Sequence, residues 1–234
     1  MKSEILARRS FKQRALNFIT KDKLTLILFT LLGIIAAAFI ISAFLANKGS
    51  FTITLPREQM INLGLVISDT SDFSRKRYEI LAPPVIDMWN ITRDNIPENV
   101  NEIDGSHNGQ HYLAMTVYLK NTGDKNLEYT ANLDLTEVYR NVDEALRVEL
   151  YVNDVSTIYA KRRGGWSGQP EPETVPFLGI SRIISLEPKP INIGQVEKFT
   201  IVSWIEGNDP DCINDLLGGY VKMAMSFSGT VIKE

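Results

Sequence analysis

The acidic run from Glu206 to Asp215 holds side chains that could perform chemistry. Glu206, Asp209 and Asp211 lie close together in it, and carboxylate oxygens are the ligands that calcium prefers. Their spacing does not match an EF-hand loop, and Asn, Asp, Gly and Pro are also the residues that turns require. The run therefore predicts an acidic turn, with calcium binding as an open alternative, and its three carboxylates are candidate interaction residues.

A second candidate surface is the Gly- and Pro-rich stretch 161–176, which is predicted to be a long loop. It contains Arg162, Arg163 and Trp166. Arg and Trp are enriched where proteins bind one another, because both combine a large contact area with polar groups. These three residues are therefore candidates for contact with a partner, and a plain hairpin tip is the alternative.

Motifs for catalysis are missing from the sequence. His107 and His111 could bind a transition metal if a helix held them on one face, but the stretch 101–111 has two glycines and no helical periodicity. A polar hairpin fits it better. The chain shows no Gly-rich phosphate loop, nucleophile elbow or metalloprotease helix. We therefore predict a protein that is not an enzyme and binds no cofactor or metal, with calcium in the acidic run as the open alternative.

Alternating apolar and polar residues predict the elements that must position these loops. The pattern is clearest in residues 111–120, 127–135, 146–152, 155–160 and 196–205. Weaker strands are expected at 51–55, 63–67, 78–81, 177–186 and 221–227, with loops at 95–110 and 161–176. Many short strands separated by turns predict a mainly β fold, an antiparallel β-sandwich of the immunoglobulin-like or jelly-roll-like type.

The run from Leu24 to Ala46 contains no charged residue. As a helix it would be roughly 34 Å long, enough to cross a hydrocarbon core of about 30 Å. We therefore predict three parts, namely a basic cytoplasmic tail (1–23), a transmembrane helix (24–46) and an extracytoplasmic domain (47–234). A cleaved signal peptide is the alternative, although bulky Phe44 and Ile41 stand where cleavage after Ala46 or Ala43 needs small residues.

Charge predicts the orientation. The tail 1–23 has seven basic and two acidic residues, net +5, so the total of −3 leaves −8 for the rest of the chain. Because Lys and Arg are retained in the cytoplasm, the N-terminus is expected inside and the domain outside the plasma membrane. The acidic exterior excludes nucleic acid as an expected partner, and a single cysteine, Cys212, excludes an intramolecular disulfide.

Four segments carry a resemblance to known proteins, namely YLAMTVYLKNTGDKNLEYTANL (112–133), VDEALRVELYVND (142–154), IYAK (158–161) and FTIVSWIEGNDPDCINDLLGGYVKMAMSF (199–227). Together they resemble a family of uncharacterised single-pass membrane proteins from Firmicutes. The resemblance implies a short basic tail, one membrane helix and a β-rich exterior, and it brings no catalytic residue. In layout alone, the chain is also similar to camelysin and TasA-type biofilm matrix proteins.

Together these features predict a membrane-anchored interaction or assembly module at the surface of a Gram-positive bacterium. Its expected partners are the lipid bilayer and another envelope protein, or further copies of itself. The alternative is a subunit of a surface fibre or biofilm matrix that a signal peptidase releases, as in camelysin and TasA-type proteins.

Overall fold

A computed structural model describes residues 21–46, 51–164 and 167–232 of the chain. The chain divides into two compact units, Met1–Asn47 and Lys48–Glu234, and each is described by itself. Residues 1–20 of the predicted tail 1–23 and the candidate residue Trp166 lie outside the described residues.

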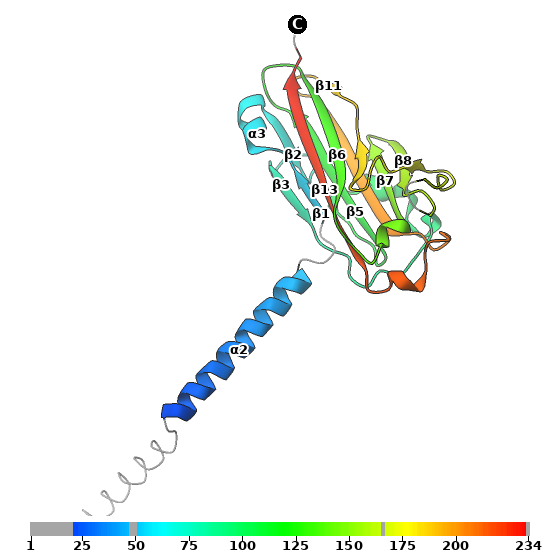
Figure 1. Cartoon of the computed structure of the whole chain (residues 1–234). Helices are drawn as coiled ribbons and strands as arrows, with labels where there is room; N and C mark the ends of the chain where they lie inside the picture. The colour runs from blue at the N-terminus through cyan, green and yellow to red at the C-terminus, as the bar shows by residue number, and fades with distance from the viewer. Residues whose placement is uncertain (1–20, 47–50, 165–166, 233–234) are drawn as a thin grey trace, which may run out of the picture. The chain divides into compact units, whose positions relative to one another are not determined.

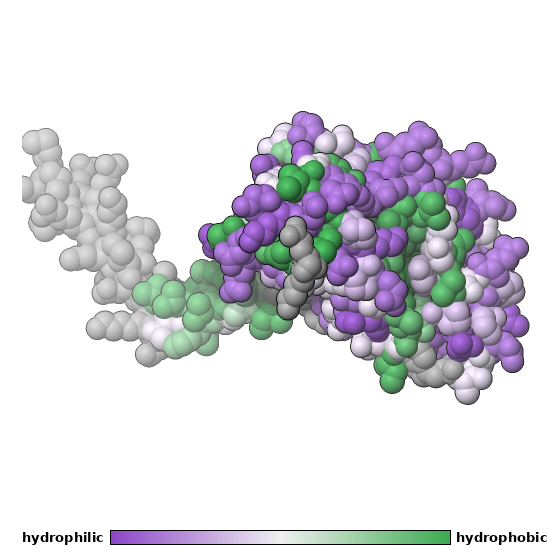
Figure 2. Space-filling view, turned by 90° about the horizontal axis from the view of Figure 1, so that it is seen from above, coloured by the Kyte–Doolittle hydropathy of each residue, from purple (hydrophilic) through white to green (hydrophobic). Residues whose placement is uncertain are grey.

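The described part of the first unit is one helix, α2 (Lys21–Ala46). All its side chains from Lys23 to Ile40 are exposed, and these residues are long and apolar enough to cross a membrane, a property that signal sequences share. Figure 2 shows the described part of this helix mostly in the colour of hydrophobic residues, whereas the visible face of the β domain is mixed. The apolar helix predicted at 24–46 is therefore present.

The described part of the second unit is mainly β, with two sheets that Figure 1 shows lying one behind the other. In the six-stranded sheet the order is β10 (Arg182–Ser185), β6 (Leu127–Tyr139), β13 (Tyr220–Val231), β1 (Phe51–Thr54) and β3 (Glu79–Ala82), and β11 (Lys189–Ile191) also pairs with β6. In the seven-stranded sheet the order is β2 (Leu65–Ser68), β5 (Tyr112–Asn121), β12 (Val196–Ile205), β7 (Leu146–Val152), β8 (Val155–Ala160) and β9 (Val175–Pro176), and β4 (Gly105–Ser106) also pairs with β5.

The expectation of a purely antiparallel arrangement is wrong in two places. Strand β1 runs parallel to β13, with Phe51 opposite Met223, and the short β9 runs parallel to β8. A tight hairpin forces antiparallel pairing, but β1 and β13 are the first and last strands and no short turn joins them. Nothing in local sequence therefore fixed the direction of this pair.

Short helices fill some of the connections. They are α3 (Arg57–Leu63) and the 3₁₀ helices η1 (Arg93–Asn95), η2 (Glu98–Glu102), η3 (Val142–Glu144) and η4 (Asn214–Leu216). The predicted loop 95–110 thus contains η2 and the small strand β4.

The two sheets pack face to face around one hydrophobic core. Phe199 of β12 contacts Tyr129 of β6 and Phe227 of β13 edge to face, with ring centroids 5.9 and 4.9 Å apart. Aromatic rings in this geometry attract one another beyond the gain from burial. Because these pairs join strands of different sheets, the domain is sandwich-like.

The outer face of the β5–β12–β7 layer is covered as well. Trp204 and Tyr151 form a second buried cluster with Ile96 and Val100 from the η1–η2 segment. The η1–η2 segment therefore covers a sheet face that the alternation of apolar and polar residues predicts to be exposed to solvent. The candidate loops lie near one end of the same layer.

Candidate functional site

The structure brings the two candidate loops together. The backbone N–H of Gly164 donates to Asp211 Oδ2 at 3.1 Å, which ties the loop 161–176 to the acidic loop. Arg163 donates two hydrogen bonds of 3.1 Å to Glu171, from Nε and Nη2. Arg163 and Asp211, predicted as separate surfaces, thus belong to one site.

Arg147 contacts both the loop 161–176 and the acidic loop. It is the second residue of β7, and its side chain points away from the main core. Its Nη1 lies 2.7 Å from Asp209 Oδ2, and its Nη2 lies 3.5 Å from Glu171 Oε2. We call the five residues Arg147, Arg163, Glu171, Asp209 and Asp211 the loop network.

Three charged residues of the loop network are buried, so each depends on an oppositely charged partner. Arg147, Glu171 and Asp209 are each no more than 6% exposed, and charges removed from water are tolerated only when opposite charges compensate them. The hydrogen bonds that Arg163 donates to Glu171 also raise the pKa of Arg163, which keeps its guanidinium charged. The network therefore fastens both loops to β7.

The carboxylates of Glu171, Asp209 and Asp211 lie close enough together to offer three oxygens to one cation. Two of them already face guanidinium groups, and Asp211 accepts the hydrogen bond from Gly164. Calcium, which takes six to eight oxygen ligands, would have to compete with Arg147 for Asp209. The geometry therefore favours a structural ion network at this position.

The other candidates have local roles. Arg162 Nη1 donates to the carbonyl of Gly168 within its own loop at 3.3 Å. Glu206 accepts from Trp204 Nε1 at 2.9 Å and from the N–H of Asn208 at 3.1 Å. Glu206 thus satisfies a buried indole and closes a turn, and it is not part of the loop network.

The two histidines do not converge on a metal. His107 Nδ1 and Nε2 lie 2.8 and 2.7 Å from the carbonyls of Gly105 and Val100. His111 instead stacks on Trp89, with ring centroids 5.6 Å apart, and its Nδ1 accepts from the N–H of Trp89 at 3.2 Å. These contacts favour structural roles for both rings.

Sequence reasoning missed Glu171 and Arg147 as site residues. Alternation in residues 146–152 predicts that Arg147 and Glu149 point outward, away from the core, but both side chains are buried. Glu149 is paired with Arg93 of η1 at 2.7 Å. A charged residue in an alternating strand normally marks a solvent-exposed face of the sheet. The alternation in β7 therefore did not indicate that other segments cover its outer face.

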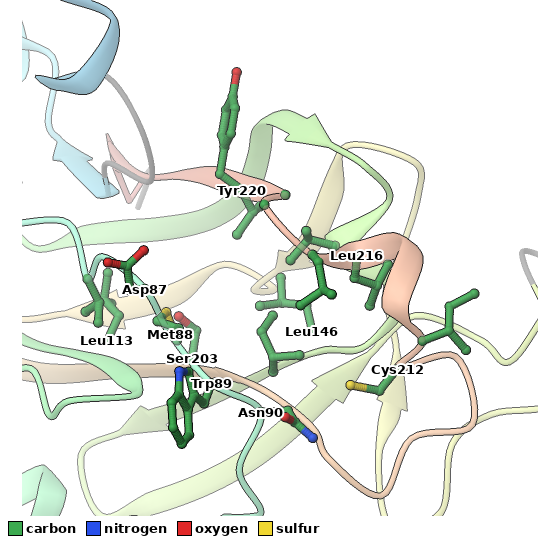
Figure 3. Close-up of a pocket in the computed structure, with 18 of the residues that line it drawn as sticks. Asp87, Met88, Trp89, Asn90, Leu113, Leu146, Ser203, Cys212, Leu216 and Tyr220 are labelled. Atoms are coloured by element: carbon green, nitrogen blue, oxygen red, sulfur yellow. The ribbon is translucent and has the colours of Figure 1, made fainter. Parts of the chain in front are cut away.

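Sequence reasoning also missed an apolar pocket of about 890 Å³ at one end of the domain (Figure 3). Its volume falls in the range of about 300–1,000 Å³ that small-molecule sites occupy. Both sheets contribute walls, the first through β1 and β13 and the second through β5, β7 and β12. Among the residues that line it are Phe51, Leu113, Leu146, Met223, Trp89 and Cys212.

Cys212 belongs to the acidic run and also lines the pocket. Figure 3 shows its side chain on the side of the pocket opposite Met88, and it is partly buried. Burial raises the pKa of this thiol, and the negative charges of Asp209 and Glu206 raise it further. The thiol is therefore a small apolar group of the pocket wall rather than an activated nucleophile.

Comparison with known proteins gives little further information. No family model matches the sequence, and no curated protein matches it. Among solved structures, a β-glucosidase from Kluyveromyces marxianus is similar over 73% of this chain, with 14% sequence identity and a TM-score of 0.23. The chain spans 17% of that enzyme. Similarity at this level carries no argument, so the proposals below rest on the residues and geometry of this chain.

Proposed function

We propose that the chain is a single-pass membrane protein of a Gram-positive cell surface, with its β domain working outside the plasma membrane as a non-enzymatic interaction or assembly module. The observation that carries the proposal is α2, a 26-residue helix whose side chains from Lys23 to Ile40 are all exposed. Apolar surface costs about 25 cal/mol per Å² in water. A lipid bilayer is the surrounding that removes this cost.

The sequence around α2 supports the orientation. Seven basic residues precede or begin the helix, and the 23 residues from Leu24 to Ala46 carry no charge. An excess of Lys and Arg is retained in the cytoplasm, which leaves the acidic domain outside. For the domain we propose the immunoglobulin-like or jelly-roll-like type, because both consist of two sheets packed face to face.

The loop network supports an interaction role. Its buried ion pairs fix the loop 161–176 on the sheet, while the side chain of Arg163 remains 49% exposed. A surface that is already ordered loses less conformational entropy when a partner binds. The partner we propose is another envelope protein or a second copy of this chain.

Cell fractionation tests the anchor. The full-length protein of 26.4 kDa should stay in the membrane fraction after an alkaline carbonate wash. A variant with Ile34→Arg and Ile35→Arg should lose stable insertion, because each charge at the centre of the membrane costs about 2.5–3.5 kcal/mol. A species about 5 kDa lighter in the medium would contradict the anchor and favour the exported fibre or matrix subunit.

Cross-linking in intact cells tests the interaction surface. Trp166→Ala should lower the yield of cross-linked complexes while the folded domain persists, because Trp contributes large contact areas to interfaces. Leu178→Ala is the control, an exposed apolar side chain of the neighbouring connection. An equal yield for both variants and the unaltered protein would exclude Trp166 from the interface.

A further inference from the structure

The apolar pocket lies where the chain enters the domain from α2. Phe51 is the first residue of β1 and lines the pocket. Four residues, 47–50, stand between it and the end of α2 at Ala46. Fully extended, a chain of this length spans about 18 Å at most. In a protein anchored through α2, the backbone of Phe51 is therefore tethered within about 18 Å of the end of the helix.

Apolar residues make up most of the pocket lining, and Asn90, Ser203 and Asn214 also contribute to it. Phe51, Leu113, Leu146 and Met223 are each no more than 5% exposed, so the inner wall is part of the core of the domain. In Figure 3, Leu146 and Leu216 lie toward the middle of the lining residues, and the ring of Tyr220 projects away from them. Asp87 is the one carboxylate among the lining residues of the described chain.

Large apolar side chains are also exposed around the mouth. Trp89, Ile213 and Leu217 line the pocket and are 73%, 55% and 67% exposed. A soluble domain gains nothing by exposing such residues together, and clusters of them mark binding surfaces. Trp in particular is enriched at the boundary between lipid and water, where its ring meets both environments.

We propose that this pocket takes up the hydrocarbon chain of a lipid from the bilayer that α2 spans. The inference rests on the proposed anchor, because the short connection between α2 and Phe51 is what would keep this pocket-lining residue within reach of lipid. An acyl chain fits a deep apolar cavity that opens between two sheets, as small-molecule sites do. Asp87 disfavours a free fatty acid, whose carboxylate would be repelled by it.

Photocrosslinking in vesicles tests the proposal with the full-length protein. The probe is phosphatidylcholine that carries a diazirine at the terminal end of one acyl chain. In an ordinary bilayer this end lies near the midplane, where α2 is the segment of this chain that reaches it. Labelling of the buried wall around Leu146 or Met223 therefore requires that the acyl chain has entered the pocket, and mass spectrometry of peptides locates the label.

Matched variants make the assignment specific. Replacing Ile213 and Leu217 by Asp puts two charges at the mouth and should lower labelling of the pocket wall about tenfold, with labelling of α2 unchanged. Replacing Leu178 and Ile180 by Asp makes the same chemical change at exposed residues that do not line the pocket. This control should leave both labels unchanged.

The outcomes separate the inference from the anchor on which it rests. Label on α2 together with label on the pocket wall supports both. Label on α2 alone overturns the acyl-chain proposal and leaves the anchor standing. Absence of label on α2 overturns the anchor itself. Cross-links from the pocket wall to another polypeptide instead of lipid would mean that the pocket holds a protein segment, which also overturns the proposal.

Discussion

Arg147 illustrates how one residue can join two loops that are far apart in the sequence. From β7 it reaches Glu171 in one loop and Asp209 in the other. All three are buried, so each charge depends on the others for compensation. Removing one partner leaves a buried charge without compensation, and this destabilises the fold by more than the intact ion pair stabilises it.

Replacing Arg147 should therefore destabilise the domain strongly. We expect Arg147→Met to lower the free energy of unfolding by about 3–5 kcal/mol, because Glu171 and Asp209 lose their common partner. Urea unfolding of the full chain in detergent, followed by circular dichroism, measures the loss. Arg182→Met is the control, because its pair with Asp134 at 2.7 Å is solvent-accessible and should contribute less than about 1 kcal/mol. Equal losses would contradict a structural loop network.

The raised pKa of Cys212 gives a second prediction. Burial, Asp209 and Glu206 all disfavour the thiolate, so the folded chain holds this proton to higher pH than the unfolded chain. The rate of alkylation by iodoacetamide follows the thiolate. Its pH midpoint should therefore be higher for the folded protein than for the protein in urea.

The raised pKa of Cys212 also makes the free energy of unfolding depend on pH. Because unfolding lowers the pKa of Cys212, the unfolded chain releases the proton first, and stability falls as pH rises above the unfolded value. Cys212→Ser removes all labelling and serves as the blank, since the chain has one cysteine. A folded midpoint at or below the unfolded one would mean that the thiol is activated.

Residue types alone pointed to part of the site. Arg163, Asp209 and Asp211 were identified because charged residues in Gly- and Pro-rich loops commonly serve binding or turns. That the loops meet, and that Arg147 and Glu171 complete the ion network, depends on how distant strands pair. A single sequence does not show which distant strands pair. The alternation of apolar and charged residues in a strand is also the same whether its outer face is exposed to water or covered by a loop.

At the scale of elements, alternation predicted the strands that bury one face. The predicted strands 111–120, 146–152, 155–160 and 196–205 agree with β5, β7, β8 and β12 to within one residue at each end. Alternation failed for α3, which has Pro56 at its N-cap, no capping side chain and no buried residue. Met60 and Leu63 are partly buried against the core, but a helix of seven residues with no side-chain cap at its N-terminus is too short to give a periodic signal.

The end of α3 gives the third prediction. Gly64 ends the helix with φ of 68°, and a Cβ there would lie 2.4 Å from the backbone nitrogen of Gly123. Gly194 has φ of 79° and open space around it. Gly64→Ala should cost about 1–3 kcal/mol more than Gly194→Ala, because the left-handed strain is common to both and the clash is not.

Thermal melting of the two glycine variants measures this difference. Two equal shifts in melting temperature would show that the turn at Thr122 and Gly123 moves aside to accept the methyl group. A larger shift for Gly64→Ala would show that the contact between the end of α3 and this turn is rigid.

At the scale of the whole molecule, the sequence separated an apolar helix from a β-rich region, because uninterrupted hydrophobicity and period-two alternation are strong and different signals. The apolar pocket was not predictable in this way. It is lined by β1 and β13 of one sheet and by β5, β7 and β12 of the other, and each of its inner residues looks like an ordinary core residue in the sequence. A cavity is a property of the distance between layers, which alternation does not encode.

The last prediction concerns the independence of the β domain. Among the residues that the structure describes, its hydrophobic clusters contain none before Phe51, so the domain should keep its core when residues 1–47 are removed. We expect the shortened chain to melt within a few degrees of the full chain in detergent, because about 1 kcal/mol shifts the melting temperature of a domain this size by only about 2–4 °C. Calorimetry of both proteins checks this expectation. A far lower melting temperature without the helix would show that α2 contributes to the fold, and the picture of a self-sufficient module on an anchor would be wrong.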